Sequence, residues 1–239
     1  STMIPNIAQL QTKLRIETIK KIDSKVQTHQ SKQEFDNAIE LAQKAMEIFE
    51  ANEEWEEFME TAYELAMLYK ITLCFSEMIQ SIDYTLKIHQ EKYAFDSFWK
   101  VYFLYEKGSG LHYDDQITEA IPYYIEVCQL MLKEKREEDL LISSLMDLLM
   151  SYMTLDKKKE AQQALNTASE LLNKGTQYSN AIIGDYYLYK AEWELNLCKY
   201  ELARQSFEKA YEAFPSNIHH KKSLAHLRAG MMYGLLGNR

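Results

Sequence analysis

The sequence is poor in the two residues that make tight turns, because its 239 residues include only 7 glycines and 3 prolines. An all-β sandwich or barrel needs many turns, which glycine and proline commonly supply. Their scarcity makes such a fold unlikely, and it excludes collagen-like and low-complexity chains. The composition therefore favours a mostly helical protein, and the length alone suggests one or two domains.

Cysteine is also scarce, and Cys74, Cys128 and Cys198 form no Cys-x-x-Cys pair. Neither a disulfide framework nor a zinc site is indicated. Each cysteine has apolar neighbours, so we expect buried free thiols and a reducing, cytoplasmic compartment. No apolar run approaches the roughly 18 residues that a membrane-spanning helix needs. No signal peptide is recognisable at the start, although a signal that has been removed stays an open alternative.

Negative charge is concentrated in the first half of the chain. Residues 1–120 contain 12 Lys and Arg against 21 Asp and Glu, whereas residues 121–239 contain 15 of each. Nucleic acids and anionic membranes prefer basic surfaces, so we expect neither as a partner. A neutral or basic protein partner is compatible with this charge.

The clearest structural unit is a helical hairpin that spans Gly184 to Pro215. Its second half carries small, aromatic and small side chains at offsets of 4 and 3, which places them on one stripe of a helix. Its first half carries a second stripe, and Pro215 ends the hairpin. We expect the turn near Cys198. The two stripes consist of Ala203, Phe207 and Ala210, and of Tyr187, Ala191 and Leu195.

The same hairpin recurs along the chain. One position near the start of each second helix returns at steps of 40, 42, 41 and 42 residues. A register sustained over most of the chain predicts a repeat protein in which each unit packs on its neighbours. These positions are Ala38, Met78, Ala120, Ala161 and Ala203.

The hairpin resembles the tetratricopeptide repeat (TPR), which has an aromatic and a small residue in its first helix, then tyrosine, alanine, an aromatic residue, alanine and a closing proline. The matching residues are Tyr187, Ala191, Tyr200, Ala203, Phe207, Ala210 and Pro215. Glu194 departs from the pattern, because the family usually has tyrosine there. The units exceed the usual 34 residues. They are similar to the long repeats of Rap- and PlcR-type peptide receptors, kinesin light chain and LGN-type scaffolds.

The resemblance implies an all-α fold, a right-handed superhelical solenoid of about 11 helices. We expect one domain over residues 1–239, as a fragment of a longer chain, with repeats near 5–51, 53–91, 94–134, 137–173, 179–215 and a partial repeat at 219–239. The segment 108–114 contains two of the seven glycines, and we interpret it as a lengthened loop. We place Pro122 in the first turn of its helix, where proline is tolerated.

No motif for catalysis stands out. The Gly108–Gly110 segment lacks a phosphate-loop pattern, and His219, His220 and His226 lack the spacing of metal ligands. Acidic clusters are typical of solvated helix starts. We therefore expect no enzyme, metal or cofactor. A phosphatase activator of the Rap kind or a helical hydrolase stays an alternative, which metal analysis and a hydrolase screen would test.

In TPR proteins the first helix of each repeat lines a concave groove, and the resemblance therefore implies the ligand-binding residues. Methionine adapts to irregular ligands, tyrosine offers contact area at a small entropic cost, and the acids suit a basic side chain or an N-terminal amine. The alternative for the methionines is ordinary packing between helices. The predicted groove residues are Glu60, Tyr63, Glu64, Met67, Trp99, Phe103, Met146, Asp147, Met150, Asp185, Tyr189, Glu192, Asn196, Arg228 and Met231.

The sequence thus predicts a non-catalytic scaffold that captures a peptide segment or a protein partner in its groove. The alternative is a peptide-sensing regulatory domain of a larger cytosolic signalling or transcription regulator. The last predicted helix, 219–236, has an apolar face without a partner helix, so a homodimer through this helix is a further hypothesis.

Overall fold

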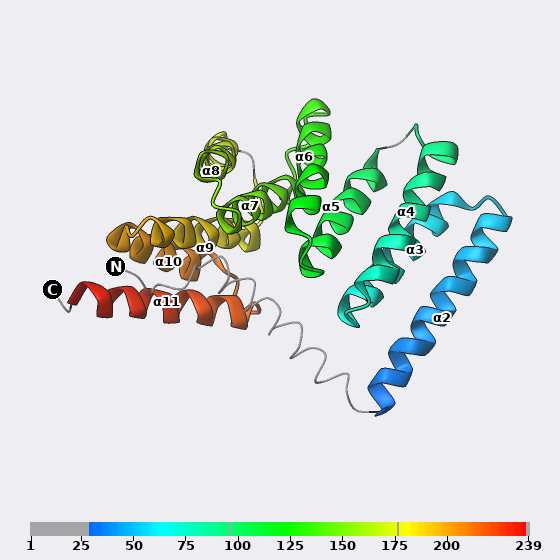
Figure 1. The fold of residues 1–239 in the computed structure, drawn as a ribbon, viewed down its shortest axis with the longest axis horizontal. Coiled ribbons are helices and arrows are strands. Elements are labelled where there is room, and N and C mark those ends of the chain that lie inside the picture. The colour runs from blue at the N-terminus through cyan, green and yellow to red at the C-terminus, as the bar shows by residue number, and fades with distance from the viewer. Residues whose placement is uncertain (1–28, 96, 176, 238–239) are drawn as a thin grey trace. The chain divides into compact units, whose positions relative to one another are not determined.

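The computed structural model describes residues 29–95, 97–175 and 177–237, and within them it contains ten α-helices and no β-strand (Figure 1). The predicted first helix, 5–30, lies outside the described residues except for its last two positions. The other ten predicted helices are all present. They are α2 (His29–Ala51), α3 (Trp55–Ile71), α4 (Phe75–Lys92), α5 (Phe98–Tyr113), α6 (Ile117–Lys133), α7 (Asp139–Thr154), α8 (Lys158–Asn173), α9 (Asn180–Asn196), α10 (Tyr200–Ala213) and α11 (His219–Gly237).

The described helices belong to two compact units, divided between residues 130 and 131. The N-terminal unit, residues 29–130, contains α2 to α5 and most of α6. In it α3 packs against α2, α4 and α5, and α4 also packs against α5. Its core is apolar and tightly enclosed, because burial of each large side chain stabilises the fold by about 1.5–3 kcal/mol. Fully or almost fully buried members are Phe58, Ala62, Ala66, Met78, Ile82 and Phe103.

The C-terminal unit, residues 131–237, contains the hairpins α7–α8 and α9–α10 and the single helix α11. In it α10 packs between α9 and α11, and α7 packs against α9. The stripes predicted from the sequence form the core here, which confirms the hairpin. Ala191 of α9, Ala203, Phe207 and Ala210 of α10, and Ala225 of α11 are all completely buried. The small residues allow the helix axes to approach closely around the Phe207 ring.

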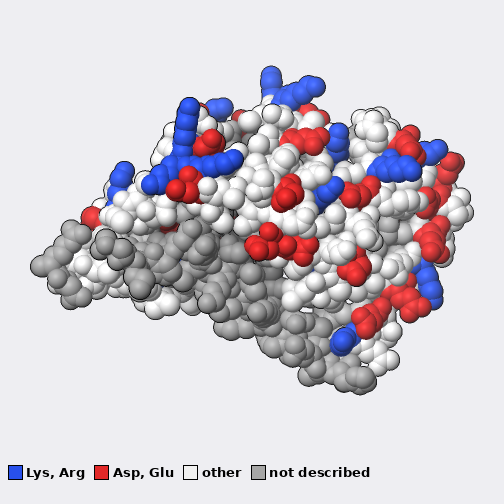
Figure 2. Space-filling model, viewed as in Figure 1, with Lys and Arg blue, Asp and Glu red and all other residues white. Residues whose placement is uncertain are grey.

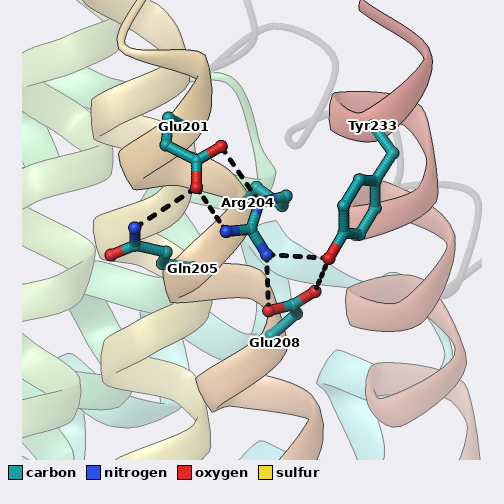
Figure 3. A network of polar contacts seen from close by, with 5 residues as sticks. All are labelled: Glu201, Arg204, Gln205, Glu208 and Tyr233. Carbon is teal, nitrogen blue, oxygen red and sulfur yellow. Dashed lines mark hydrogen bonds and ion pairs between the residues drawn. The ribbon is translucent and has the colours of Figure 1, made fainter. Parts of the chain in front are cut away.

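A polar network also joins α11 to α10 (Figure 3). Arg204 of α10 donates hydrogen bonds to Glu208, at 2.8 Å, and to the Tyr233 hydroxyl of α11, at 2.9 Å. The same hydroxyl donates to Glu208 at 2.8 Å. Arg204 also forms an ion pair with Glu201 in the first turn of α10. Tyr233 is therefore held from two sides, although more than half of its surface is exposed.

The turn inside each described hairpin has one repeated geometry. One residue has a left-handed φ between 56° and 63°, and the amide of the next residue donates to the carbonyl five positions before it, at 2.8–2.9 Å. This is the Schellman arrangement, which satisfies the last carbonyls of a helix. The left-handed residues recur at steps of 42, 41 and 42, and five residues beyond each lies a fully buried side chain of the predicted register. The left-handed residues are Leu73, Asp115, Asp156 and Cys198.

The segment 108–114 is not a lengthened loop, and that prediction was wrong. Gly108 and Gly110 lie inside α5, which continues to Tyr113. A Cβ atom at Gly108 would lie 2.9 Å from the Tyr124 ring of α6, and one at Gly110 would lie 3.2 Å from Met78 Sδ of α4. The glycines therefore allow close helix packing instead of making a turn.

Two further expectations need correction. Pro122 is the sixth residue of α6, in its second turn. Both Pro122 and Thr118, whose carbonyl loses its helical donor, are exposed, so water can satisfy that carbonyl. Cys198 is exposed, because it occupies the left-handed position of a turn, whereas Cys128 is buried and Cys74 is half-buried. All three thiols are free.

Candidate functional site

Ion pairs join consecutive first helices of the repeats within each unit. In the N-terminal unit Lys70 of α3 lies 3.1 Å from Glu106 of α5. In the C-terminal unit Lys221 and Arg228 of α11 lie 2.8 Å from Asp185 and 3.4 Å from Glu192 of α9. Each pair joins residues 36 positions apart. The predicted groove residues Asp185, Glu192 and Arg228 are therefore bound to one another or to a neighbouring lysine.

The face shared by α3 and α5 is rich in aromatic side chains. The ring of Tyr63 on α3 lies 6.2 Å from Trp99 and 6.1 Å from Tyr102, both on α5. Trp99 and Tyr102 also contact each other and Phe98, which is 43% exposed. Tyr63, Trp99 and Tyr102 are each half-buried, so each ring offers part of its surface to water.

Carboxylates border these rings. Glu56 of α3 accepts a hydrogen bond from Trp99 Nε1, at 3.2 Å, and another from the Tyr93 hydroxyl. Glu60 follows Glu56 by four residues and precedes Tyr63 by three, so it lies on the same stripe of α3. Glu60 and Glu64 are exposed. We name Glu56, Glu60, Tyr63, Trp99 and Tyr102 the aromatic–acidic face.

The phenol of Tyr63 is strongly held in its neutral form. Burial is the largest cause, and it raises the Tyr63 pKa to about 12; the Glu106 carboxylate raises the pKa further, while Lys70 opposes it. An ordinary tyrosine has a pKa near 10. Tyr63 is therefore a neutral hydrogen-bond donor at physiological pH, and its ring remains intact as a contact surface beside the carboxylates.

The predicted groove residues of the C-terminal unit are mostly buried. Met146, Asp147 and Met150 of α7 are at most 5% exposed, and Glu192 and Arg228 are also buried. Buried side chains cannot contact a ligand without rearrangement. Asp185, Tyr189 and Asn196 of α9 are half-buried, and Met231 of α11 is exposed.

In the third repeat the structure differs from the expected choice of residues. Phe103 is fully buried in the core of the N-terminal unit, so it offers no surface to a ligand. Tyr102, which sequence reasoning missed, lies on the accessible face instead. The common turn could have identified it, because Tyr102 precedes Asp115 by 13 residues as Glu60 precedes Leu73 by 13. Interpreting residues 108–114 as a loop obscured that register.

The described residues 29–95, 97–175 and 177–237 contain no group of three His, Cys, Asp or Glu side chains that could hold a metal ion. Burial, followed by the charge of Lys221, lowers the pKa of His220. Over the same residues, no helix combines the length and the apolar character needed to cross a bilayer.

The fold is similar to that of two solved structures. BtubC (BKLC) from P. vanneervenii superposes with a TM-score of 0.72 and 16% sequence identity, over 85% of this chain and 84% of that chain. A Rap protein complexed with the competence and sporulation factor superposes with a TM-score of 0.60 and 13% identity, over 98% of this chain and 73% of that chain. The chain is an all-α helical-repeat protein. Its loose similarity to Rap, expected from the sequence, is confirmed at the level of the fold.

The sequence itself gives no such comparison, since no protein-family model and no curated protein matches it. At 13–16% identity the solved structures show the fold alone. The functional argument therefore depends on the residues of the chain.

Proposed function

We propose that this protein is a non-catalytic helical-repeat scaffold that binds a peptide segment on the first helices of its repeats. The observation that carries the proposal is the aromatic–acidic face, where partly exposed rings and carboxylates occupy neighbouring first helices. Such a surface combines a large contact area with directional polar groups, which suits a peptide better than a small substrate. The fold shared with a Rap protein complexed with a peptide factor supports the same proposal.

The proposed mechanism is capture of a segment by a preformed surface. The helices are fixed by buried cores and by ion pairs between first helices, so most of the ordering cost falls on the ligand. Within the C-terminal unit Tyr189 and Asn196 of α9 are the accessible candidates, since tyrosine supplies contact area and asparagine can bond a peptide backbone. Met67 of α3 and Met231 of α11 would supply adaptable contacts.

Isothermal titration against a library of short peptides tests the proposal. We expect saturable binding by at least one peptide, with weaker binding after Tyr189→Ala or Asn196→Ala. Unchanged binding in both variants would remove α9 from the binding surface. A library without a single binder would overturn the proposed function.

A second candidate function is a peptide-sensing regulatory domain acting in the cytoplasm. The observation that favours it is the structural similarity to Rap in its peptide complex. A sensor changes conformation when its ligand binds, whereas a scaffold need not. Small-angle scattering with and without a peptide that binds distinguishes the two, because only the sensor predicts a change in the radius of gyration. Scattering also tests the proposed homodimer through α11, which would double the mass.

A further inference from the structure

We propose that the aromatic–acidic face of α3 and α5 binds the guanidinium group of an arginine in a peptide ligand. The inference rests on the proposed function, because it names the side chain that the peptide would present. It concerns five residues of the N-terminal unit: Glu56, Glu60, Tyr63, Trp99 and Tyr102.

The first argument is the exposed part of the aromatic rings. Tyr63 lies within 6.2 Å of both Trp99 and Tyr102, and all three rings keep part of their surface accessible. A cation that approaches the face of a tryptophan or tyrosine ring is attracted by the ring electrons. The chain already uses this contact elsewhere, since Lys107 Nζ lies 4.5 Å from the centre of the Tyr123 ring.

The second argument is charge complementarity. Residues 29–130 contain 7 Lys and Arg against 20 Asp and Glu, and between Lys44 and Lys70 there are eight glutamates and no basic residue. Figure 2 shows acidic side chains predominating along the edge of the N-terminal unit formed by α2. Among the described residues no lysine or arginine lies within ion-pair distance of Glu56, Glu60 or Glu64. Lys70, at the end of the same face, is already paired with Glu106.

The corresponding helices of the C-terminal unit show what is different here. There the acids on α9 receive their cations from α11, as Asp185 does from Lys221 and Glu192 from Arg228. Across from Glu56, α5 presents the indole of Trp99 instead of a cation. The negative charge on α3 is therefore available to a cation that arrives with a ligand.

Arginine fits this surface better than lysine. Its guanidinium is planar, so it can stack on Trp99 or Tyr102 while its N–H groups donate to a carboxylate at the edge of the ring. The ammonium of lysine is more strongly hydrated and cannot stack. Glu60 is the carboxylate best placed to accept, because it is exposed and lies between Glu56 and Tyr63 on α3.

The test is a titration of the full chain with three probes, monitored by NMR at the tryptophan indole N–H signals. The probes are acetylated and amidated pentapeptides with arginine, citrulline or lysine at the centre of four alanines. We expect the arginine probe to shift the Trp99 signal and to bind about tenfold more tightly than the citrulline probe, which has the same shape without the charge. Lysine should be intermediate, and added salt should weaken the binding of both cationic probes.

Variants locate the site. Glu60→Gln should weaken binding of the arginine probe severalfold, and Tyr102→Leu should do the same by removing a ring. Glu77→Gln is the matched control, because Glu77 is an exposed acid of the same unit on α4. Glu60 is exposed and has no intramolecular hydrogen bond or ion pair within the described residues, so its variant should fold normally. Equal binding of the arginine and citrulline probes, or equal effects of Glu60→Gln and Glu77→Gln, would overturn the inference.

The outcomes also separate this inference from the proposed function. Library peptides that bind without any preference for arginine leave the scaffold intact and refute the arginine site. An arginine probe that binds at Trp99 while no library peptide binds refutes the scaffold and keeps the cation site. Binding by a free N-terminal amine alone, tested with an unacetylated alanine peptide, would refute the assignment to arginine.

Discussion

Glu192 of α9 and Arg228 of α11 form an ion pair of 3.4 Å whose side chains are 0% and 5% exposed. Removing one partner of a buried pair leaves the other charge without compensation, at a cost of about 3–5 kcal/mol. This pair therefore has more influence on the packing of α11 than any ion pair at the surface of the unit.

The first prediction concerns this pair. Arg228→Ala should lower the free energy of unfolding by about 3 kcal/mol or more, because Glu192 stays buried without its cation. Replacing both residues by leucine should restore part of the loss. Urea unfolding measures both effects. Lys174→Ala is the control, since the Lys174–Glu137 pair is 3.8 Å long and largely exposed, and its loss should change stability by less than about 1 kcal/mol.

The second prediction compares two glycines. A Cβ atom at Gly184 of α9 would lie 2.4 Å from the buried Phe214 ring, whereas one at Gly230 of α11 would meet nothing within 4 Å. Gly184→Ala should therefore destabilise the C-terminal unit by about 1–3 kcal/mol through overpacking. Gly230→Ala should stabilise it by up to about 1 kcal/mol, because alanine favours the helix. Thermal unfolding checks both, and equal effects would contradict the packing seen here.

The third prediction is a pH dependence at Tyr63. Its pKa is about 12 when folded, mainly because the phenol is buried, and near 10 when unfolded. The folded state holds the proton more tightly, so stability from this group is present below pH 10 and is lost as the pH rises to about 12. Tyr63→Phe should lose about 1 kcal/mol less over that window, a figure reduced because the ring is partly exposed. Urea unfolding at several pH values gives the difference, and ultraviolet titration should show one late-ionising tyrosine fewer.

The fourth prediction concerns the attachment of α11. Tyr233→Phe removes the hydrogen bonds between its hydroxyl and both Arg204 and Glu208. The loss should be about 0.5 kcal/mol, since the network is largely exposed, and hydrogen exchange should become faster in α11 than in α9. Tyr211→Phe is the control, because the Tyr211 hydroxyl makes no hydrogen bond within the described residues. A uniform change over all helices would argue against a local attachment.

Local pattern was sufficient for the helices and their register. Met78, Ala120, Ala161 and Ala203 were predicted to recur along the chain, and all four are fully buried. Helical periodicity carries this information, because a side chain that repeats at a fixed offset must return to the same face. The pattern was misleading at Gly108, since glycine serves both turns and close helix packing, and only the position of Tyr124 distinguishes the two.

The candidate site could be predicted only in part. Glu60, Tyr63 and Trp99 were named from the sequence and lie on the aromatic–acidic face, whereas Phe103 points into the core and Tyr102 was missed. Met146 and Met150 show the same difficulty, because a methionine on a first helix can face a ligand or a neighbouring helix, and here both are buried.

The sequence by itself determined the helices, their repeated turns and the acidic character of the first half, because these depend on residues close together in the chain. Only the tertiary structure decided which acids are neutralised internally and which remain available. Glu192 meets Arg228, whereas Glu56 meets the Trp99 indole, and those partners lie 36 and 43 residues away. The charge left for a ligand depends on such contacts between helices, whose partners local periodicity does not specify.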